Sequence, residues 1–241
     1  GDAYEGGYVK APQNGRNKWI VSFDLNSLYP HLIMQYNISP ETILGTWQDD
    51  IGVEGLLNKE FDTSVWKEKN VTVTPNGSVY RKDKQGFLPK LMESMYNDRV
   101  TYKQLMLEEQ KKGRNADPNK LSQYYNYQQN LKIALNSAYG AMGNQWFRYY
   151  DERNAEAVSV AGQLSVQWAE NAVNGYLNAT LGTVNKDYIV AMDTDSLYVC
   201  LGDLVSKVGI TDDEKIINFL DKACGRIEGV IEDAYKELAE Y

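Results

Sequence analysis

An acid-rich turn between two short apolar runs is the feature that most restricts how this chain can fold. Residues 187–192 (Asp-Tyr-Ile-Val-Ala-Met) and 197–201 (Leu-Tyr-Val-Cys-Leu) have the composition of strands, and residues 193–196 between them are Asp-Thr-Asp-Ser. So short a connection predicts a β-hairpin whose turn is made of carboxylates. Carboxylates at the ends of apolar strands are costly unless a positive charge neutralises them. The hairpin therefore indicates a cation site as well as an antiparallel sheet.

A second acid stands at the end of another predicted strand. Residues 18–23 (Lys-Trp-Ile-Val-Ser-Phe) are rich in aromatic and β-branched side chains, and Asp24 follows them. If this strand lies beside the hairpin, Asp24 and Asp195 could jointly hold two metal ions. Oxygen ligands suit Mg²⁺ better than zinc. A lone Asp-Thr-Asp is usually just a polar turn, and the second strand-end acid is what favours the metal site.

Two long amphipathic segments predict a helical hairpin in the middle of the chain. Apolar residues recur at three- and four-residue steps from 88 to 112, and Gly113 ends the pattern. Asp117 and Pro118 then suit the N-cap and first position of a second helix that runs towards Gly140. Further helices are expected after Asn154 and from the capping box that begins at Thr211. Residues 37–86 are expected to form loops, short strands and at most one helix. These elements together predict an α+β fold.

The helical hairpin also concentrates positive charge. The formal charge of the whole chain is −8, but residues 81–114 contain nine Lys or Arg against five Asp or Glu. Arg99 and Lys103 share one face of the first helix because they are four residues apart. The second helix presents a cation, an amide, an aromatic ring and a glycine at the same period: Lys132, Asn136, Tyr139 and Gly140. Each charge taken singly is more often solvated, but two such faces together could hold a polyphosphate.

Composition narrows the class of protein. Apolar residues make up 43% and charged residues 24% of 241 residues, as in a soluble globular protein of one large domain or two coupled subdomains. No apolar run approaches the ~18 residues of a membrane span. Cys200 and Cys224 lack metal-site spacing. These features predict an intracellular protein in a reducing compartment.

The ordered motifs resemble those of family B DNA polymerases. Residues 24–30 (Asp-Leu-Asn-Ser-Leu-Tyr-Pro) look like motif A, residues 132–140 like motif B and residues 193–196 like motif C. Residues 4–7 (Tyr-Glu-Gly-Gly) are similar to the Y-x-G-G element that joins exonuclease and polymerase parts in that family. The segments that most resemble T-even-type phage replicative polymerases are 37–43 and 144–151. The resemblance covers nearly the whole chain.

The resemblance implies a polymerase architecture and a metal-dependent reaction. It implies a palm, an antiparallel sheet with packed helices, formed by residues 1–87 and 141–241, and a two-helix fingers subdomain at 88–140. Two Mg²⁺ ions, for which Mn²⁺ can substitute, are the implied cofactors. The implied metal ligands are Asp24, the Leu25 carbonyl and Asp195, with Asp193 as a further candidate, and the implied catalytic residues are Asp24, Asp195 and Lys132.

The same resemblance assigns substrates and partners. The implied dNTP-binding residues are Ser27, Leu28, Tyr29, Arg99, Lys103, Lys132, Asn136 and Tyr139, with Tyr29 walling off the ribose 2′ position. The implied template or base-pair contacts are Tyr139, Gly140, Tyr4, Gly6 and Gly7. Primer-template DNA, dNTPs and, through a longer parent chain, a sliding clamp are the expected partners, in the cytoplasm of a phage host.

Some features depart from the family pattern and keep other functions open. Met192 replaces the usual glycine before Asp-Thr-Asp, and the helical hairpin is short for a T-even-type enzyme. Exonuclease motifs and a thumb motif are not found, so we expect a palm-and-fingers piece of a longer chain. The alternatives are a non-catalytic nucleotide- or DNA-binding fragment, an RNA-copying polymerase and a two-metal nuclease. A nuclease has no need of a triphosphate-binding hairpin.

Overall fold

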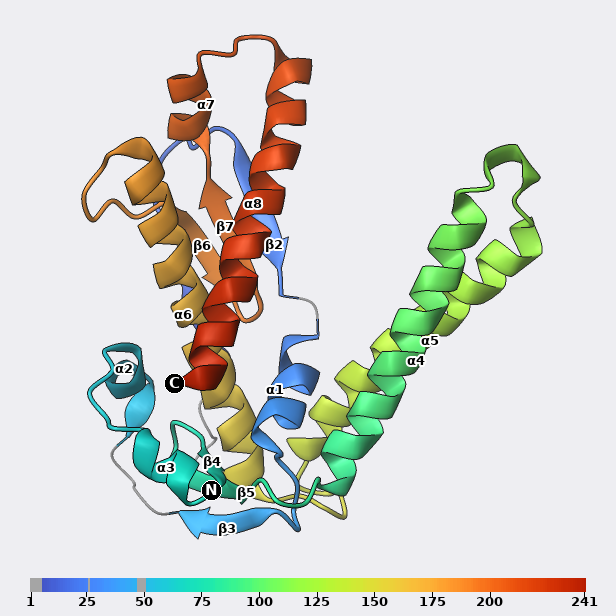
Figure 1. Cartoon of the computed structure of the whole chain (residues 1–241), viewed down its shortest axis with the longest axis vertical. Helices are drawn as coiled ribbons and strands as arrows, with labels where there is room; N and C mark the ends of the chain where they lie inside the picture. Colours follow the sequence, from blue (N-terminus) through green and yellow to red (C-terminus); the bar gives the residue numbers. More distant parts are fainter. Residues whose placement is uncertain (1–5, 26, 47–50) are drawn as a thin grey trace. The chain divides into compact units, whose positions relative to one another are not determined.

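A computed structural model describes residues 6–25, 27–46 and 51–241 and divides them into two compact units (Figure 1). The described part of the first, called the hairpin unit, comprises residues 27–46, 51–52 and 64–159. The described part of the second, called the sheet unit, comprises residues 6–25, 53–63 and 160–241. Each unit has its own antiparallel sheet and its own buried residues, so each is described by itself.

The sheet unit contains a four-stranded antiparallel sheet in the order β1-β6-β7-β2. The predicted hairpin is confirmed as β6 (Ile189–Asp193) and β7 (Ser196–Cys200), and the predicted strand as β2 (Ile20–Asp24). β2 pairs with β7 over all five residues, as the metal-site hypothesis requires. The edge strand β1 (Val9–Lys10) was not predicted, because two residues are too short to show alternation.

Helices α6 (Glu152–Leu181), α7 (Gly202–Val208) and α8 (Asp213–Glu240) accompany this sheet in sequence, and the first residues of α6 belong to the hairpin unit. α8 buries a stripe at three- and four-residue steps: Ile216, Leu220, Ala223, Ile227, Ile231 and Ala234. Its N-cap is Asp212, whose carboxylate accepts from the amides of Glu214 and Lys215. The expected cap, Thr211, is thus displaced by one residue, since a carboxylate is favoured at the positive end of a helix.

The hairpin unit is built around α4 (Phe87–Gln110) and α5 (Pro118–Met142), which confirm the two predicted helices (Figure 1). A 3₁₀ turn at Gly113–Asn115 joins them. Asp117 caps α5 by accepting from the Asn119 amide at 2.9 Å, with Pro118 in the first turn. Tyr102 of α4 stacks on Tyr127 of α5 with ring centroids 4.9 Å apart. The helices therefore run antiparallel as a packed pair.

Smaller elements complete the hairpin unit. Helix α1 (Leu28–Tyr36) begins with Pro30 in its first turn, where a missing N–H costs nothing. A three-stranded antiparallel sheet has the order β3-β5-β4, formed by Ile43–Thr46, Ser78–Arg81 and Val71–Val73. Helix α3 (Ser64–Glu68) also belongs to this unit, whereas α2 (Gly52–Leu57) lies in the sheet unit from Val53 onwards. Residues 37–86 thus contain two short helices where one was expected. The core of the unit includes Ile33, Ile38, Tyr80, Met92 and Leu135.

None of the helices in residues 6–25, 27–46 and 51–241 is both long enough and apolar enough to span a membrane.

Candidate acidic and basic sites

The strand register brings the predicted acids together in the sheet unit. Asp24, the last residue of β2, lies opposite Ser196, the first residue of β7. The next amide along, that of Leu25, donates to the Asp195 carbonyl at 2.8 Å. Burial and then the negative charge of Asp24 raise the pKa of Asp195. Two strand-end carboxylates therefore repel each other at one end of the sheet, an arrangement that a bound cation would relieve.

The turn that carries Asp195 has a strained backbone. Residues Asp193 and Ser196 pair, so Thr194 and Asp195 alone make the connection, and Thr194 has a φ of 53°. A β-branched residue in the left-handed region is costly and needs support from its surroundings. The Thr194 amide donates to the Tyr8 carbonyl at 2.9 Å, and its hydroxyl donates to an Asp193 carboxylate oxygen at 3.0 Å. The turn is thus stabilised both by a hydrogen bond to Tyr8, which lies outside it, and by one to Asp193 next to it.

The donor set suits a hard divalent ion. Among residues 6–25, 27–46 and 51–241, no group of three or more His, Cys, Asp or Glu side chains gathers in a metal-binding arrangement. The strand register brings two carboxylates, Asp24 and Asp195, to this end of the sheet. An ion such as Mg²⁺, which keeps several waters and binds substrate phosphates, fits one or two protein carboxylates. Met192, which precedes the Asp-Thr-Asp turn, is buried.

In the hairpin unit, α4 and α1 bring Arg99 and Ser27 together. One guanidinium nitrogen of Arg99 donates to the Ser27 hydroxyl at 3.0 Å. Ser27 is the N-cap residue of α1 and has a φ of 60°. The Nε of Arg99 is buried and, within the described residues, has no hydrogen-bond partner. A buried donor of this kind is costly unless an acceptor reaches it, which is what an anion would supply.

Tyr29 and Tyr139 form the most ordered contact among the predicted substrate residues. Their rings are parallel to within 2° and their centroids lie 4.2 Å apart. The Tyr139 hydroxyl lies 3.4 Å from the Ser159 hydroxyl at the start of α6. Because Tyr139 is thus held at both ends, it fixes the ring of Tyr29. The sequence predicted both rings as substrate residues but gave no sign that they stack.

The other predicted substrate residues of the helical hairpin lie on α4 and α5, as the sequence periodicity predicted. Lys103 follows Arg99 by one turn on α4 and is exposed, while Lys132 is half-buried and Asn136 exposed on α5. The space beside Gly140 is open: a Cβ added there would have no neighbour within 4 Å. Leu28 is buried. These residues belong to the hairpin unit.

The Y-x-G-G element is only partly described. Tyr4 lies outside the described residues, whereas Gly6 and Gly7 are exposed parts of the sheet unit. The Gly6 carbonyl accepts from the side-chain amide of Gln163 on α6 at 2.6 Å. Gln163 and the Tyr8 carbonyl were missed by sequence reasoning. Their partners are more than 150 residues away, and no periodicity signals such a contact.

Comparison with known proteins places this chain among DNA polymerases. The sequence model described as DNA polymerase family B matches residues 1–229. A DNA-directed DNA polymerase of Escherichia phage RB69 is 35% identical, and one of Enterobacteria phage T4 is 32% identical, each over 99% of this chain. DNA polymerase 1 of Pyrococcus abyssi is 29% identical over 98% of the chain.

The relatives are much longer than this chain. The chain spans 31% of the RB69 protein, 32% of the T4 protein and 26% of the Pyrococcus protein. The two phage alignments cover 288 residues against 241 in this chain. The phage proteins therefore contain positions within these alignments that this chain lacks.

Proposed function

The chain belongs to DNA polymerase family B, and on that premise we propose that it carries the nucleotide-adding site of a DNA-templated DNA polymerase. In this reaction the 3′ oxygen of a primer forms a bond to the α-phosphorus of a dNTP. The bond from that phosphorus to the pyrophosphate oxygen breaks, and the proton of the 3′ hydroxyl passes to solvent. Residues 1–87 and 141–241 would act as the palm and residues 88–140 as the fingers.

The observation that carries this proposal is the register between β2 and β7. It sets Asp24 beside the turn that presents Asp195, so two acids from distant parts of the chain meet at one sheet end. Asp24 and Asp195, with the Leu25 carbonyl, would hold two Mg²⁺ ions, and Asp193 would assist from the same turn. Such ions activate an attacking oxygen and stabilise a leaving one.

The hairpin unit would hold the incoming nucleotide. Arg99 already donates to Ser27 and has a spare buried donor, so a phosphate oxygen could take the place that Arg99 Nε leaves unpaired. Lys103 and Lys132 would add point charges, with Lys132 next to the leaving group as a catalytic residue. The α1 N-terminus at Leu28 would contribute backbone amides.

Base and sugar recognition would come from the stacked tyrosines and their neighbours. Tyr29, fixed by Tyr139, would lie under the ribose and exclude a 2′ hydroxyl by overlap. Asn136, Tyr139 and Gly140 would pack at the new base pair, since the open space beside Gly140 admits a close neighbour. Gly6 and Gly7 would contact the template.

A primer-extension assay tests this proposal against the alternatives. A polymerase that carries this sequence should extend a DNA primer on a DNA template with dNTPs in Mg²⁺ or Mn²⁺. Extension on an RNA template but not on DNA would favour an RNA-copying enzyme. Shortening of the primer without dNTP incorporation would favour a nuclease, and DNA or dNTP binding without chemistry would favour a non-catalytic module.

A further inference from the structure

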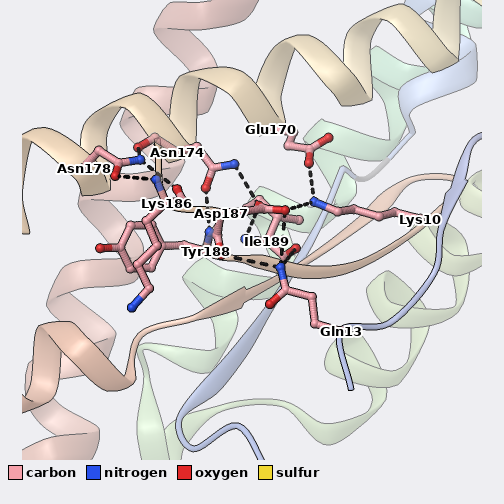
Figure 2. Close-up of polar contacts among 9 residues, drawn as sticks. All are labelled: Lys10, Gln13, Glu170, Asn174, Asn178, Lys186, Asp187, Tyr188 and Ile189. Carbon is pink, nitrogen blue, oxygen red and sulfur yellow. Dashed lines mark hydrogen bonds and ion pairs between the residues drawn. The ribbon is translucent and has the colours of Figure 1, made fainter. Parts of the chain in front are cut away.

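A network of polar side chains holds the first described residues of the chain against α6 and β6 (Figure 2). The ammonium group of Lys10 lies 2.5 Å from a carboxylate oxygen of Glu170 and 2.5 Å from one of Asp187. The Lys10 and Glu170 side chains are only 18% and 14% exposed. All of these residues belong to the sheet unit, and none was singled out by the sequence.

Asp187 is the centre of the network. Besides Lys10, its carboxylate accepts from Asn174 of α6 at 3.0 Å and from the Ile189 amide at 3.0 Å. Gln13 donates to the same carboxylate at 3.3 Å and lies within 3.4 Å of the Ile189 carbonyl, as Figure 2 shows. Asp187 therefore joins three elements at the start of β6: the segment after β1, helix α6 and β6 itself.

The strand that this network anchors, β1, is too short to stay paired with β6 through backbone hydrogen bonds alone. β1 has two residues, Val9 and Lys10, paired with Asp193 and Met192 of β6. Two residues supply few ladder hydrogen bonds, whereas β2 on the other edge pairs with β7 over five. An edge strand of that length needs side-chain anchors to stay in register, and Lys10 is both a strand residue and the anchor.

The anchored strand supports the strained turn. The carbonyl before β1, that of Tyr8, accepts the amide of Thr194, whose φ is 53°. On the other side of the turn the Leu25 amide donates to the Asp195 carbonyl. Loss of the Tyr8 contact would free Thr194 to leave the left-handed region, and Asp195, the next residue, would turn with it.

We propose that Lys10 is a positioning residue which, through Glu170 and Asp187, fixes β1 on β6 and so keeps the Thr194–Asp195 turn in the geometry that lets Asp24 and Asp195 share a metal ion. This role rests on the metal site of the proposed function. Lys10 acts through the backbone of Tyr8 and touches neither substrate nor metal.

Binding of Mn²⁺ alone by the 241-residue chain tests the proposal. Lys10→Met keeps the length of the side chain and removes its charge, which leaves Glu170 and Asp187 facing each other. We expect Mn²⁺ affinity to fall about 10-fold, as for groups that orient metal ligands indirectly. Lys10→Arg, which can bridge both acids with its fork, should bind Mn²⁺ within about 2-fold of the wild type.

Lys59→Met is the matched control. Lys59 lies in the same unit and forms an ion pair with Glu237 at 2.8 Å, a pair that includes no residue of the turn. Both Lys→Met changes make the unit more negative by one charge, and charge alone predicts equal or tighter Mn²⁺ binding. Weaker binding by Lys10→Met with unchanged binding by Lys59→Met therefore supports positioning. Equal binding by all variants overturns it, whatever their unfolding temperatures.

Amide hydrogen exchange tests the same link without a metal. Lys10→Met should speed exchange of the Thr194 amide, which bonds to Tyr8, and leave the Leu25 amide protected. Gln13→Leu, an uncharged change at an exposed residue, should speed exchange of the Thr194 amide to a smaller extent. This variant provides the test if Lys10→Met does not fold. Unchanged Thr194 exchange in a folded variant refutes the role of Lys10. A wild-type chain that binds no Mn²⁺ refutes the proposed metal site together with this inference.

Discussion

The sheet unit and the hairpin unit place their functional side chains by different means. In the sheet unit, backbone hydrogen bonds between β2 and β7 set Asp24 beside the turn that carries Asp195. In the hairpin unit, side-chain contacts do this, such as Arg99 on Ser27 and Tyr29 on Tyr139. A ladder fixes an acid even when its charge is unpaired, while side-chain contacts can be exchanged for contacts to a ligand.

The two units also differ in net charge. The described residues of the hairpin unit contain 15 Lys or Arg and 11 Asp or Glu, against 10 and 18 in the sheet unit. Among the described residues, the excess of acids therefore lies in the sheet unit alone. An acidic unit attracts cations and a mildly basic one attracts phosphates.

The largest effect should follow from removing an acid that the ladder fixes. Asp195→Asn in a polymerase that carries this sequence should lower primer extension by at least about 1,000-fold, since a metal site supplies several kcal/mol of transition-state stabilisation. Circular dichroism should show an unchanged fold, and Asp221→Asn, an exposed acid on α8, should extend normally. Near-normal extension by Asp195→Asn would remove the acid turn from the mechanism.

A smaller loss is expected from a cation of the hairpin unit. Lys132→Ala should weaken dNTP use by about 10- to 100-fold, the value of a charge-assisted hydrogen bond. The dNTP dependence of single-nucleotide insertion, measured at saturating DNA, checks this, with the exposed Lys120→Ala on the same helix as control. A loss confined to DNA affinity would mean that the hairpin binds the duplex rather than the triphosphate.

The stacked pair should give a smaller effect again. Tyr29→Ala should admit ribonucleotides readily, and Tyr139→Leu should do so in part, because Tyr29 then loses its stacking partner. A stacked pair contributes about 0.5–1.5 kcal/mol, so discrimination against ribonucleotides should fall by about 2- to 10-fold in Tyr139→Leu. Competition between a dNTP and its ribonucleotide gives the ratio. A ratio equal to wild type would show that Tyr29 is held without Tyr139.

The smallest effect concerns acid pH and the Lys10 network. Burial raises the pKa of Asp187, but its bonds to Lys10 and Asn174 outweigh burial and lower that pKa below its usual value. A carboxyl with a depressed pKa stabilises the fold above its unfolded pKa and loses that contribution as pH falls through the folded value.

Lys10→Met should therefore lower the free energy of unfolding at pH 7 by about 1 kcal/mol, since Asp187 is partly exposed to solvent. The difference from wild type should shrink as pH falls below about 4, where free Asp is protonated. Urea unfolding at pH 7 and pH 3 checks this. A difference that is the same at both pH values would show that Asp187 is not the partner that matters.

The sequence by itself determined the elements that have a long local signal. Periodicity predicted α4, α5, α6 and α8, the apolar runs predicted β2, β6 and β7, and the motifs named Asp24 and Asp195 as a pair. These features depend on neighbours a few residues away, so a single sequence contains the information. Asp212 rather than Thr211 as the cap of α8 is a small error of the same local kind.

Only the tertiary structure decided what depends on distant partners. The two-residue strand β1, the Gln163 contact to Gly6 and the Lys10 network join residues 157 to 184 positions apart, and the Tyr29–Tyr139 stack spans 110. Short elements and single side-chain contacts leave no periodic pattern, because their stability comes from packing against parts of the chain that the local sequence does not specify. The types of residue at the candidate site were therefore predictable, while the supports that hold them were not.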